Sequence, residues 1–314
     1  MRVDTNEHHD MVAKLGITMG FDAFREWSPS LTDGAYVPRI DVLWCQRLSG
    51  AQVEALETVG ARAPRDGDLP IAAWEIEGSD ASTKGMGANL ANLRVTEAPF
   101  SFLAVRGGTK DNLYERALCV AKTQRHYFGC QAAVPLDTRW LLDLAALPLS
   151  REKVSLPGKR VRGGGGEGDW AEVVRASLRQ RGTLAGFGVT ESSRSLLSPA
   201  DGFTEHQIDL IWTLPMPKGL RTLLEAIGDH DSRLSREHLI LDRRYDQVTI
   251  AAFEIENSRS KHGFGGLLAL AAHGVNGVFV AGDRTCAKNA AAALATYRRF
   301  MRLHHVSVYD GHAR

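Results

Sequence analysis

Short apolar runs recur along the chain between polar stretches and segments rich in Ala and Leu. They are RIDVLWC, PIAAWEIE and FSFLAV in the first half (39–45, 70–77 and 100–105), and QIDLIWTL, TIAAFEIE and GVFVAG in the second half (207–214, 249–256 and 277–282). Apolar runs of this length predict buried β-strands. The Ala-rich segment 286–303 and the apolar stripe of Trp170, Val173, Val174 and Leu178 predict helices.

The predicted order in each half is helix, strand, strand, strand, helix, strand, helix. A further strand is expected near QAAVPL (131–136) in the first half. Strands that alternate with helices indicate an α/β fold in which helices flank a mixed sheet.

The two halves repeat one pattern. IDVLW followed by IAAWEIEGS in the first half matches IDLIW followed by IAAFEIENS in the second. The match extends upstream, where Gly20-Phe21 and Glu26 align with Gly186-Phe187 and Glu191, and downstream, where KGMGANLANL aligns with HGFGGLLALA. Ordered self-similarity of this kind indicates that one structural unit is used twice.

A glycine-rich basic segment separates the copies. Residues 156–168 include four successive glycines and several Arg and Lys residues, and such a composition is typical of a flexible linker. The predicted units are therefore 1–155 and 169–314, each long enough for its own core.

Each copy keeps three acids in its predicted strands. They are Asp41, Glu75 and Glu77 in the first copy, and Asp209, Glu254 and Glu256 in the second. Side chains two apart on a strand share a face, so the glutamates of each Glu-Ile-Glu project together. Three adjacent carboxylates repel one another, and a divalent cation removes that conflict. Oxygen ligands favour Mg²⁺ or Mn²⁺.

The alternative is that these acids are solvated residues at exposed strand ends. The apolar context of both Glu-Ile-Glu segments argues against exposure, and the repetition of the pattern favours a shared chemical role. Duplication alone could also preserve the pattern.

The acids and their order resemble the PD-(D/E)xK superfamily of restriction-endonuclease-like nucleases. The resemblance implies that Asp41 and Glu75 bind Mg²⁺ in the first copy, and Asp209 and Glu254 in the second. The family's Lys position is occupied here by Glu77 and Glu256. This Glu-x-Glu variant is similar to that of some type II restriction enzymes, in which the second Glu is taken as a metal ligand or general base.

The role of the family's lysine stays open. Lys84 and Lys261 lie near the start of the helix after each Glu-Ile-Glu strand, where each could hold a substrate phosphate or be an ordinary solvated lysine. Glu26 and Glu191 lie upstream of the two aspartates. They are candidate additional ligands, because an upstream acid is common in the family.

Composition narrows the function classes. The 314 residues carry 38 Lys+Arg and 37 Asp+Glu, a net charge of +1, which excludes a polybasic mode of nucleic-acid binding. Four scattered Cys without a CxxC pair argue against a disulfide framework or a common zinc site. The polar N-terminus and the absence of a long apolar run predict a cytoplasmic protein without a membrane span. The adjacent His8 and His9 are interpreted as a loose terminal pair.

The candidate substrate-binding residues are basic. Lys159, Arg160 and Arg162 in the linker are candidates for binding a DNA backbone, or are a solvated patch. No separate reading head is recognisable, so the insert of the second copy (216–246) is the expected specificity element.

The sequence therefore predicts a Mg²⁺-dependent endodeoxyribonuclease with two fused restriction-endonuclease-like units, in which one chain cuts both strands of double-stranded DNA, in restriction or another defence against foreign DNA. One alternative is an RNA- or structure-selective nuclease, or a nuclease subunit that needs a partner. Another is a non-catalytic DNA-binding protein on the same fold. A homodimer also stays open.

Overall fold

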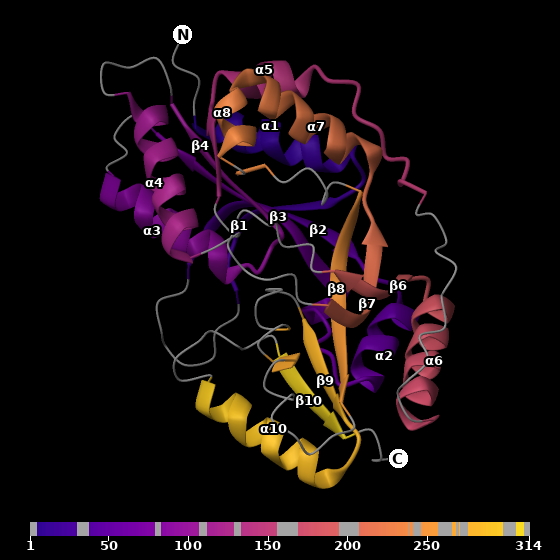
Figure 1. Cartoon of the computed structure of the whole chain (residues 1–314). Helices are drawn as coiled ribbons and strands as arrows, with labels where there is room; N and C mark the ends of the chain where they lie inside the picture. Colours follow the sequence, from indigo (N-terminus) through magenta and orange to yellow (C-terminus); the bar gives the residue numbers. More distant parts are fainter. Residues whose placement is uncertain are drawn as a thin grey trace. The chain divides into compact units, whose positions relative to one another are not determined.

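A computed structural model covers the whole chain (Figure 1). The residues that the structure describes are 5–29, 38–78, 83–106, 112–128, 133–155, 169–194, 207–237, 239–240, 246–256, 266–267, 270, 276–297 and 306–310.

The chain forms two compact units, and each unit includes a segment from the other half of the sequence. Unit 1 consists of Met1–Arg47, Asp68–Val154 and Met216–Asp246, and unit 2 consists of Leu48–Gly67, Ser155–Pro215 and Gln247–Arg314. The exchanged segments are therefore 48–67, from the first copy, and 216–246, from the second. Both connect the Asp-bearing strand to the Glu-Ile-Glu strand of their own copy.

Unit 1 contains a five-stranded mixed sheet in the order β1-β2-β3-β4-β5. Its strands are β1 (Asp22–Trp27), β2 (Ile40–Arg47), β3 (Asp68–Glu77), β4 (Phe100–Val105) and β5 (Val134–Asp137). The pairs β1–β2 and β2–β3 are antiparallel, whereas β3–β4 and β4–β5 are parallel. Its helices are α1 (Thr5–Thr18), α3 (Thr83–Val95), α4 (Leu113–Phe128), α5 (Trp140–Ala145), α7 (Lys218–His230) and α8 (Ser232–Arg236).

Unit 2 repeats this sheet in the order β10-β9-β8-β7-β6. Its strands are β6 (Gly188–Arg194), β7 (Gln207–Pro215), β8 (Gln247–Glu256), β9 (Gly277–Ala281) and β10 (Val306–Asp310). The antiparallel pairs are β6–β7 and β7–β8, and the parallel pairs are β8–β9 and β9–β10. Its described helices are α2 (Gly50–Thr58), the short 3-10 turn Arg65–Gly67, α6 (Asp169–Leu184) and α10 (Arg284–Tyr297).

Helices cover both faces of the unit 1 sheet (Figure 1). On one face, Met86, Leu90 and Leu93 of α3 pack with strand residues such as Ala73 and Leu103. On the other, α1 packs against a row of aromatic rings, in which Trp44 contacts Trp74 at a centroid distance of 5.1 Å. The two faces together form the core that holds the Glu-Ile-Glu strand β3 in the middle of the sheet, with the Asp-bearing strand β2 beside it.

A glycine in the first helix of each copy allows close contact with a buried tryptophan. A Cβ atom added to Gly16 would lie 2.6 Å from the Trp44 indole, and one added to Gly182 would lie 2.5 Å from the Trp212 indole. Both indoles are fully buried. These two contacts place α1 and α6 in the same way on their own sheets. Positions counted from Gly16 in α1 therefore correspond to positions counted from Gly182 in α6.

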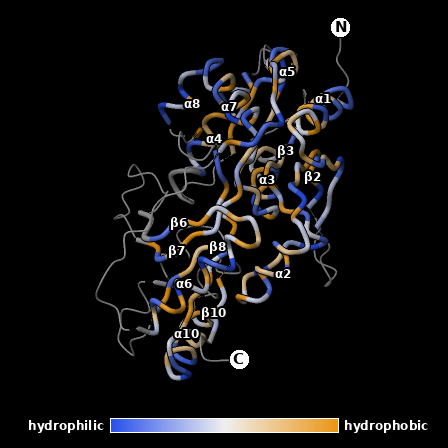
Figure 2. The backbone as a smooth tube through the Cα atoms, turned by 90° about the vertical axis from the view of Figure 1, so that its right-hand side faces the viewer, coloured by the Kyte–Doolittle hydropathy of each residue, from blue (hydrophilic) through white to orange (hydrophobic). Residues whose placement is uncertain are grey.

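The exchanged segment 216–246 is an integral part of unit 1. It begins beside the end of the first copy, where Val154 N donates to Met216 O at 3.0 Å and Gly219 N donates to Ser150 O at 3.1 Å. Hydrophobic and hydrophilic stretches alternate along α7 (Figure 2), whose apolar face is buried. The buried residues of α7 and α8 include Leu220, Leu223, Leu224, Ile227 and Leu234.

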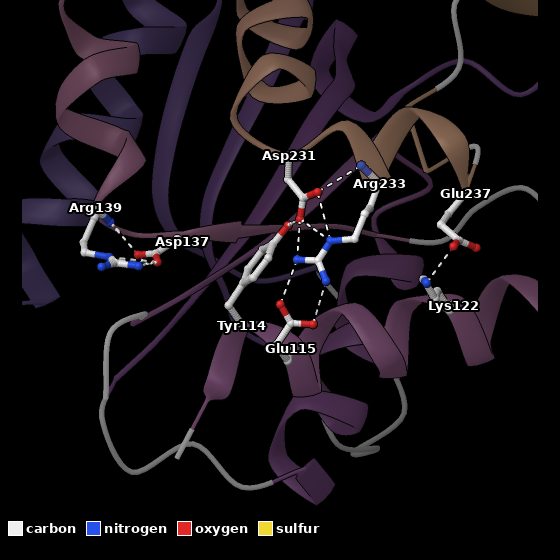
Figure 3. Close-up of polar contacts among 8 residues, drawn as sticks. All are labelled: Tyr114, Glu115, Lys122, Asp137, Arg139, Asp231, Arg233 and Glu237. Carbon is white, nitrogen blue, oxygen red and sulfur yellow. Dashed lines mark hydrogen bonds and ion pairs between the residues drawn. The ribbon is translucent and has the colours of Figure 1, made fainter. Parts of the chain in front are cut away.

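A polar cluster attaches α8 to α4 within unit 1 (Figure 3). The Arg233 guanidinium binds both carboxylate oxygens of Glu115, at 2.7 and 2.8 Å, and also binds Asp231. Tyr114 donates its hydroxyl to Asp231 at 2.8 Å, and Lys122 binds Glu237 at 2.7 Å. Burial opposes ionisation of Asp231, but its hydrogen bonds with Arg233 and Tyr114 lower its pKa to about 2.

The other exchanged segment, 48–67, is held in unit 2 by side chains that bind its backbone. Arg62 and Asn276 form two hydrogen bonds, from Arg62 N to Asn276 Oδ1 at 3.0 Å and from Asn276 Nδ2 to Arg62 O at 2.6 Å. Ser307 donates its hydroxyl to Gly60 O at 2.7 Å. Each unit is thus completed by chain from the other copy.

The predicted α/β class, with two mixed sheets flanked by helices, is confirmed. The strand expected near 131–136 is β5, but β10, its counterpart in the second copy, was not expected. The insert 216–246, predicted as a specificity element, packs into unit 1 as α7 and α8. The linker 156–168 lies outside the described residues. Among the helices that are described, none combines the length and apolar character needed to cross a membrane.

Replacing Gly16 with Ala tests the contact between helix and tryptophan. We expect the free energy of unfolding to fall by about 1–3 kcal/mol, because the added methyl group overlaps the Trp44 indole. Gly182→Ala should do the same through Trp212. Gly87→Ala in α3 is the matched control, since nothing lies within 4 Å of its Cβ position. Urea unfolding followed by circular dichroism measures all three, and equal stability of Gly16→Ala and wild type would contradict the packing argument.

Replacing Arg233 with Ala tests the attachment of α8. The change leaves Glu115 and Asp231 without their guanidinium partner, and we expect a loss of about 1–2 kcal/mol, reduced by the partial exposure of the pair. Arg236→Ala, an exposed change on the same helix, should be neutral. Hydrogen exchange of residues 218–237 should accelerate in the first variant only. Unchanged exchange there would show that the cluster does not hold the segment.

Candidate functional site

The register of β2 and β3 brings the predicted acids of unit 1 together. Leu43 lies opposite Ala73, so the same register places Asp41 opposite Glu75. Opposite residues of an antiparallel pair have Cβ atoms about 4.5–5.5 Å apart. Glu77 follows Glu75 by two positions and projects from the same face of β3. The three carboxylates therefore meet at one end of the β2–β3 ladder.

Hydrogen bonds orient two of these carboxylates. Asp41 Oδ2 accepts a hydrogen bond from Ile76 N at 2.7 Å, and the Asp41 carboxyl is also hydrogen-bonded to Glu75. Two such acids can share a hydrogen bond only if one of them holds a proton. The Glu75 side chain is buried, with 4% exposure, and its Oε1 has no hydrogen-bond partner among the described residues.

Two asparagines of α3 face the glutamates. Asn89 Nδ2 donates to Glu77 Oε1, and Asn92 is hydrogen-bonded to Glu75. The two asparagines lie about one helical turn apart, so both amides reach the same face of β3. Amide donors favour the ionised form of each glutamate, as a cation would.

Burial and mutual repulsion dominate the electrostatics of the cluster. Burial, followed by the Asp41 charge and hydrogen bond and the Glu77 charge, raises the pKa of Glu75 from 4.5 to about 9. Burial and the Asp41 charge also raise the pKa of Glu77, against the hydrogen bond from Asn89. Near neutral pH the cluster therefore carries less negative charge than its composition suggests, and it would gain that charge when a cation binds.

A buried histidine of α1 adjoins Asp41. His9 is 7% exposed, and its Nε2 lies 3.7 Å from Asp41 Oδ2. Neither ring nitrogen has a hydrogen-bond partner among the residues that the structure describes. Buried polar atoms are almost always paired, so the two nitrogens of this imidazole are hydrogen-bonding groups placed beside Asp41.

Unit 2 repeats the arrangement of its aspartate. Ile211 lies opposite Ala252, and the same register places Asp209 opposite Glu254. Asp209 Oδ2 accepts a hydrogen bond from Ile255 N at 2.8 Å, as Asp41 does from Ile76 in unit 1. Glu256 lies two positions beyond Glu254 on the same face of β8. The second set of predicted acids thus occupies the same place on its sheet.

The helix beside Asp209 carries cations. Arg175 Nη2 lies 3.6 Å from Asp209 Oδ1, and Arg175 Nη1 binds Glu172 at 2.8 Å. The next turn of α6 presents Arg179, which is ion-paired with Glu191 and lies 3.7 Å from Glu172. Unit 2 therefore combines three predicted acids with permanent positive charge next to the aspartate.

The two additional acids occupy different positions. Glu26 lies on the exposed edge of β1, is ion-paired with Arg39 and has a positive φ of 52°. Glu191 is instead turned towards Arg179 of α6. Gly20 and Gly186 have similar positive φ values, and counting from them makes Arg25, not Glu26, the counterpart of Glu191.

The predicted lysines and linker residues cannot be placed at the site. Lys84 belongs to the first turn of α3, but its side chain lies outside the described part of the chain. Lys261 and the linker residues Lys159, Arg160 and Arg162 also lie outside the described residues.

Sequence reasoning missed His9, Asn89 and Asn92. His9 was interpreted as part of a loose terminal pair, although it precedes Gly16 by about two helical turns, as Arg175 precedes Gly182. This shared spacing, anchored on the repeated glycine, was an available signal. The Asn-x-x-Asn spacing before Val95 likewise places two amides on one side of a helix.

The donor set suits a hard divalent cation, although its geometry is incomplete. Carboxylates and asparagine amides are the oxygen donors that Mg²⁺ and Mn²⁺ prefer. Among the described residues, however, no group of three or more His, Cys, Asp or Glu side chains has an arrangement that could hold a metal ion. A bound cation would require the carboxylates to converge further, and Glu75 Oε1, which has no described partner, offers one donor for it.

Comparison with protein-family models, curated proteins and solved structures found no match to this chain. Its function must therefore be inferred from the chemistry of its own side chains.

The raised pKa of Glu75 predicts how stability depends on pH. Between pH 4.5 and about pH 9 the folded chain holds a proton on Glu75 that the unfolded chain releases. In EDTA, the free energy of unfolding should therefore fall with rising pH, by roughly 2–4 kcal/mol between about pH 5 and 8 from this group. Glu75→Gln should remove that part of the decline.

Denaturant unfolding at several pH values measures this effect. Glu225→Gln, the same change at an exposed position of α7, is the control and should keep the wild-type slope. An identical pH dependence in Glu75→Gln and wild type would show that Glu75 is ionised in the folded protein near neutral pH.

Proposed function

We propose that this chain is a divalent-cation-dependent endodeoxyribonuclease with two restriction-endonuclease-like units. The observation that carries the proposal is the repeated meeting of an aspartate with a Glu-Ile-Glu strand. In both units the aspartate lies opposite the first glutamate and accepts a hydrogen bond from the isoleucine between the glutamates. Both copies of the repeated unit therefore keep the same local geometry.

The topology is compatible with the resemblance to the PD-(D/E)xK nucleases. In each unit a helix precedes an antiparallel three-stranded meander, and a parallel strand follows the Glu-Ile-Glu strand. The aspartate begins the second strand, and the glutamates end the third. This order is the support for the proposal from topology, whereas the Glu at the family's Lys position is a departure from the resemblance.

The residues of unit 1 would have different roles in phosphodiester hydrolysis. Asp41 and Glu75 would hold Mg²⁺ or Mn²⁺, which when bound lowers the pKa of water and stabilises charge on the phosphate. Glu77, oriented by Asn89, is placed to accept a proton from an attacking water. Its raised pKa makes it a stronger base than an exposed glutamate. Asp209, Glu254 and Glu256 would take the same roles in unit 2.

The competing function is DNA binding without catalysis. One observation favours this alternative. In the described part of the chain, no group of three or more His, Cys, Asp or Glu side chains is arranged to hold a metal ion. Against it, both copies retain all three acids, and burying Glu75 has a stability cost that a passive scaffold does not require. We therefore favour the catalytic proposal.

Cleavage of supercoiled plasmid tests the proposal directly. Purified chain with Mg²⁺ or Mn²⁺ should give nicked and then linear DNA, and EDTA should abolish both products. Glu77→Ala and Glu256→Ala together should reduce the cleavage rate by roughly 100-fold or more. Glu225→Ala, an exposed acid of α7, is the control and should cut normally.

The alternatives predict different products. Normal cleavage by the double variant would show that these acids are structural. A gel shift without cleavage under any metal would favour the DNA-binding alternative, and cleavage of RNA but not of DNA would favour an RNA-selective nuclease.

A further inference from the structure

The two carboxylate clusters differ at one equivalent position. Gly16 and Gly182 contact equivalent tryptophans, and about two helical turns before them lie His9 and Arg175. His9 Nε2 lies 3.7 Å from Asp41, and Arg175 Nη2 lies 3.6 Å from Asp209. The same place beside the same aspartate is thus an imidazole in unit 1 and a guanidinium in unit 2.

The difference continues along the helices. Glu172 and Arg179 surround Arg175, so that α6 presents a network of alternating charges. The equivalent positions of α1, counted from Gly16, are Asn6 and Ala13, which carry no charge. Arg175 therefore has the support of a charged helix surface, and its side chain is only 12% exposed.

The residues that follow the Glu-Ile-Glu strand also differ between the two units. Asn89 and Asn92 of α3 contact the glutamates of unit 1. In unit 2 the described residue of the corresponding segment that lies beside Glu254 is Gly266, whose Cβ position would be 3.5 Å from the Glu254 side chain. Leu267 and Leu270 pack into the core with Ala252 and Phe279, as Leu90 and Leu93 of unit 1 do with Ala73 and Leu103. Among the described residues, two amides and an imidazole therefore adjoin the acids of unit 1, whereas a guanidinium adjoins Asp209 of unit 2.

Unit 1 also contains a buried polar side chain that faces the acids. His9 is more than nine-tenths buried, faces Asp41 and has no described hydrogen-bond partner for either nitrogen. An imidazole can remain neutral beside a cation, but a guanidinium is always charged. A divalent ion among the unit 2 acids would have to displace Arg175 from Asp209 or bind next to its positive charge.

We propose that the two clusters are unequal cation sites, with the tight site in unit 1 and a much weaker one in unit 2. His9 and Arg175 cause the difference. The charged guanidinium of Arg175 repels a cation from Asp209, whereas an imidazole that stays neutral does not repel a cation from Asp41. The inference rests on the proposed function for the choice of a divalent cation. At low metal concentration unit 1 therefore binds a cation before unit 2 does. The chain then nicks one strand before the site in unit 2 is occupied.

Direct binding of Mn²⁺ to the full chain tests this inference without relying on activity. Electron paramagnetic resonance of free Mn²⁺ at pH 7.5 should reveal one tight site per chain and a second at least about 10-fold weaker. Asp41→Asn should remove the tight site, whereas Asp209→Asn should leave it intact. Arg175→His should strengthen the weak site towards the affinity of the tight one, a gain that misfolding cannot imitate.

Arg181→His is the matched control for charge, because Arg181 is exposed on the same helix. It should leave the ratio of the two affinities unchanged. Two equally tight sites in the wild-type chain would overturn the inference and leave the proposed function standing. A tight site lost in Asp209→Asn but kept in Asp41→Asn would also overturn it.

Two further results separate this inference from the proposed function. Unequal Mn²⁺ sites in a chain that cuts no nucleic acid would support the inference and refute the proposed function. No Mn²⁺ binding at millimolar concentration would overturn both.

Discussion

The antiparallel pairing of the Asp-bearing strand with the Glu-Ile-Glu strand is the constraint on which the structure depends. In unit 1 this pair is β2–β3, and in unit 2 it is β7–β8. At one end of each ladder the register forces like charges to lie opposite one another. At the other end the chain leaves to complete the other unit through an exchanged segment. One set of backbone hydrogen bonds therefore fixes the candidate site at one end and the points where the exchanged segment leaves and rejoins the sheet at the other.

Stability and chemistry compete at the site end of the ladder. A buried glutamate opposite an aspartate is destabilising, and the pKa of about 9 for Glu75 expresses that cost. The surrounding packing holds it in place, with Trp44 against Gly16 on one face and the apolar residues of α3 on the other. A carboxyl group with a strongly raised pKa in rigid surroundings is typical of a site that binds a ligand. Structural networks of ion pairs perturb pKa values as well.

The duplication provides an internal comparison. Features that both units keep, such as the glycine–tryptophan contact and the hydrogen bond from isoleucine to aspartate, are those that the local geometry requires. Features that differ, such as His9 and Arg175, are free of that requirement and can adjust the chemistry of each unit separately. A charge next to a carboxylate changes its affinity for a cation without changing the fold.

The sequence alone determined the α/β class, the duplication and the three acids that both copies keep, because strand periodicity and an internal repeat are local signals. It did not reveal that Asn89, Asn92 and His9 face the acids, since residues distant in sequence meet only through helix placement. Nor did it reveal that 216–246 completes unit 1. An amphipathic helix such as α7 specifies that one face must be buried, but only the tertiary structure decides which surface buries it.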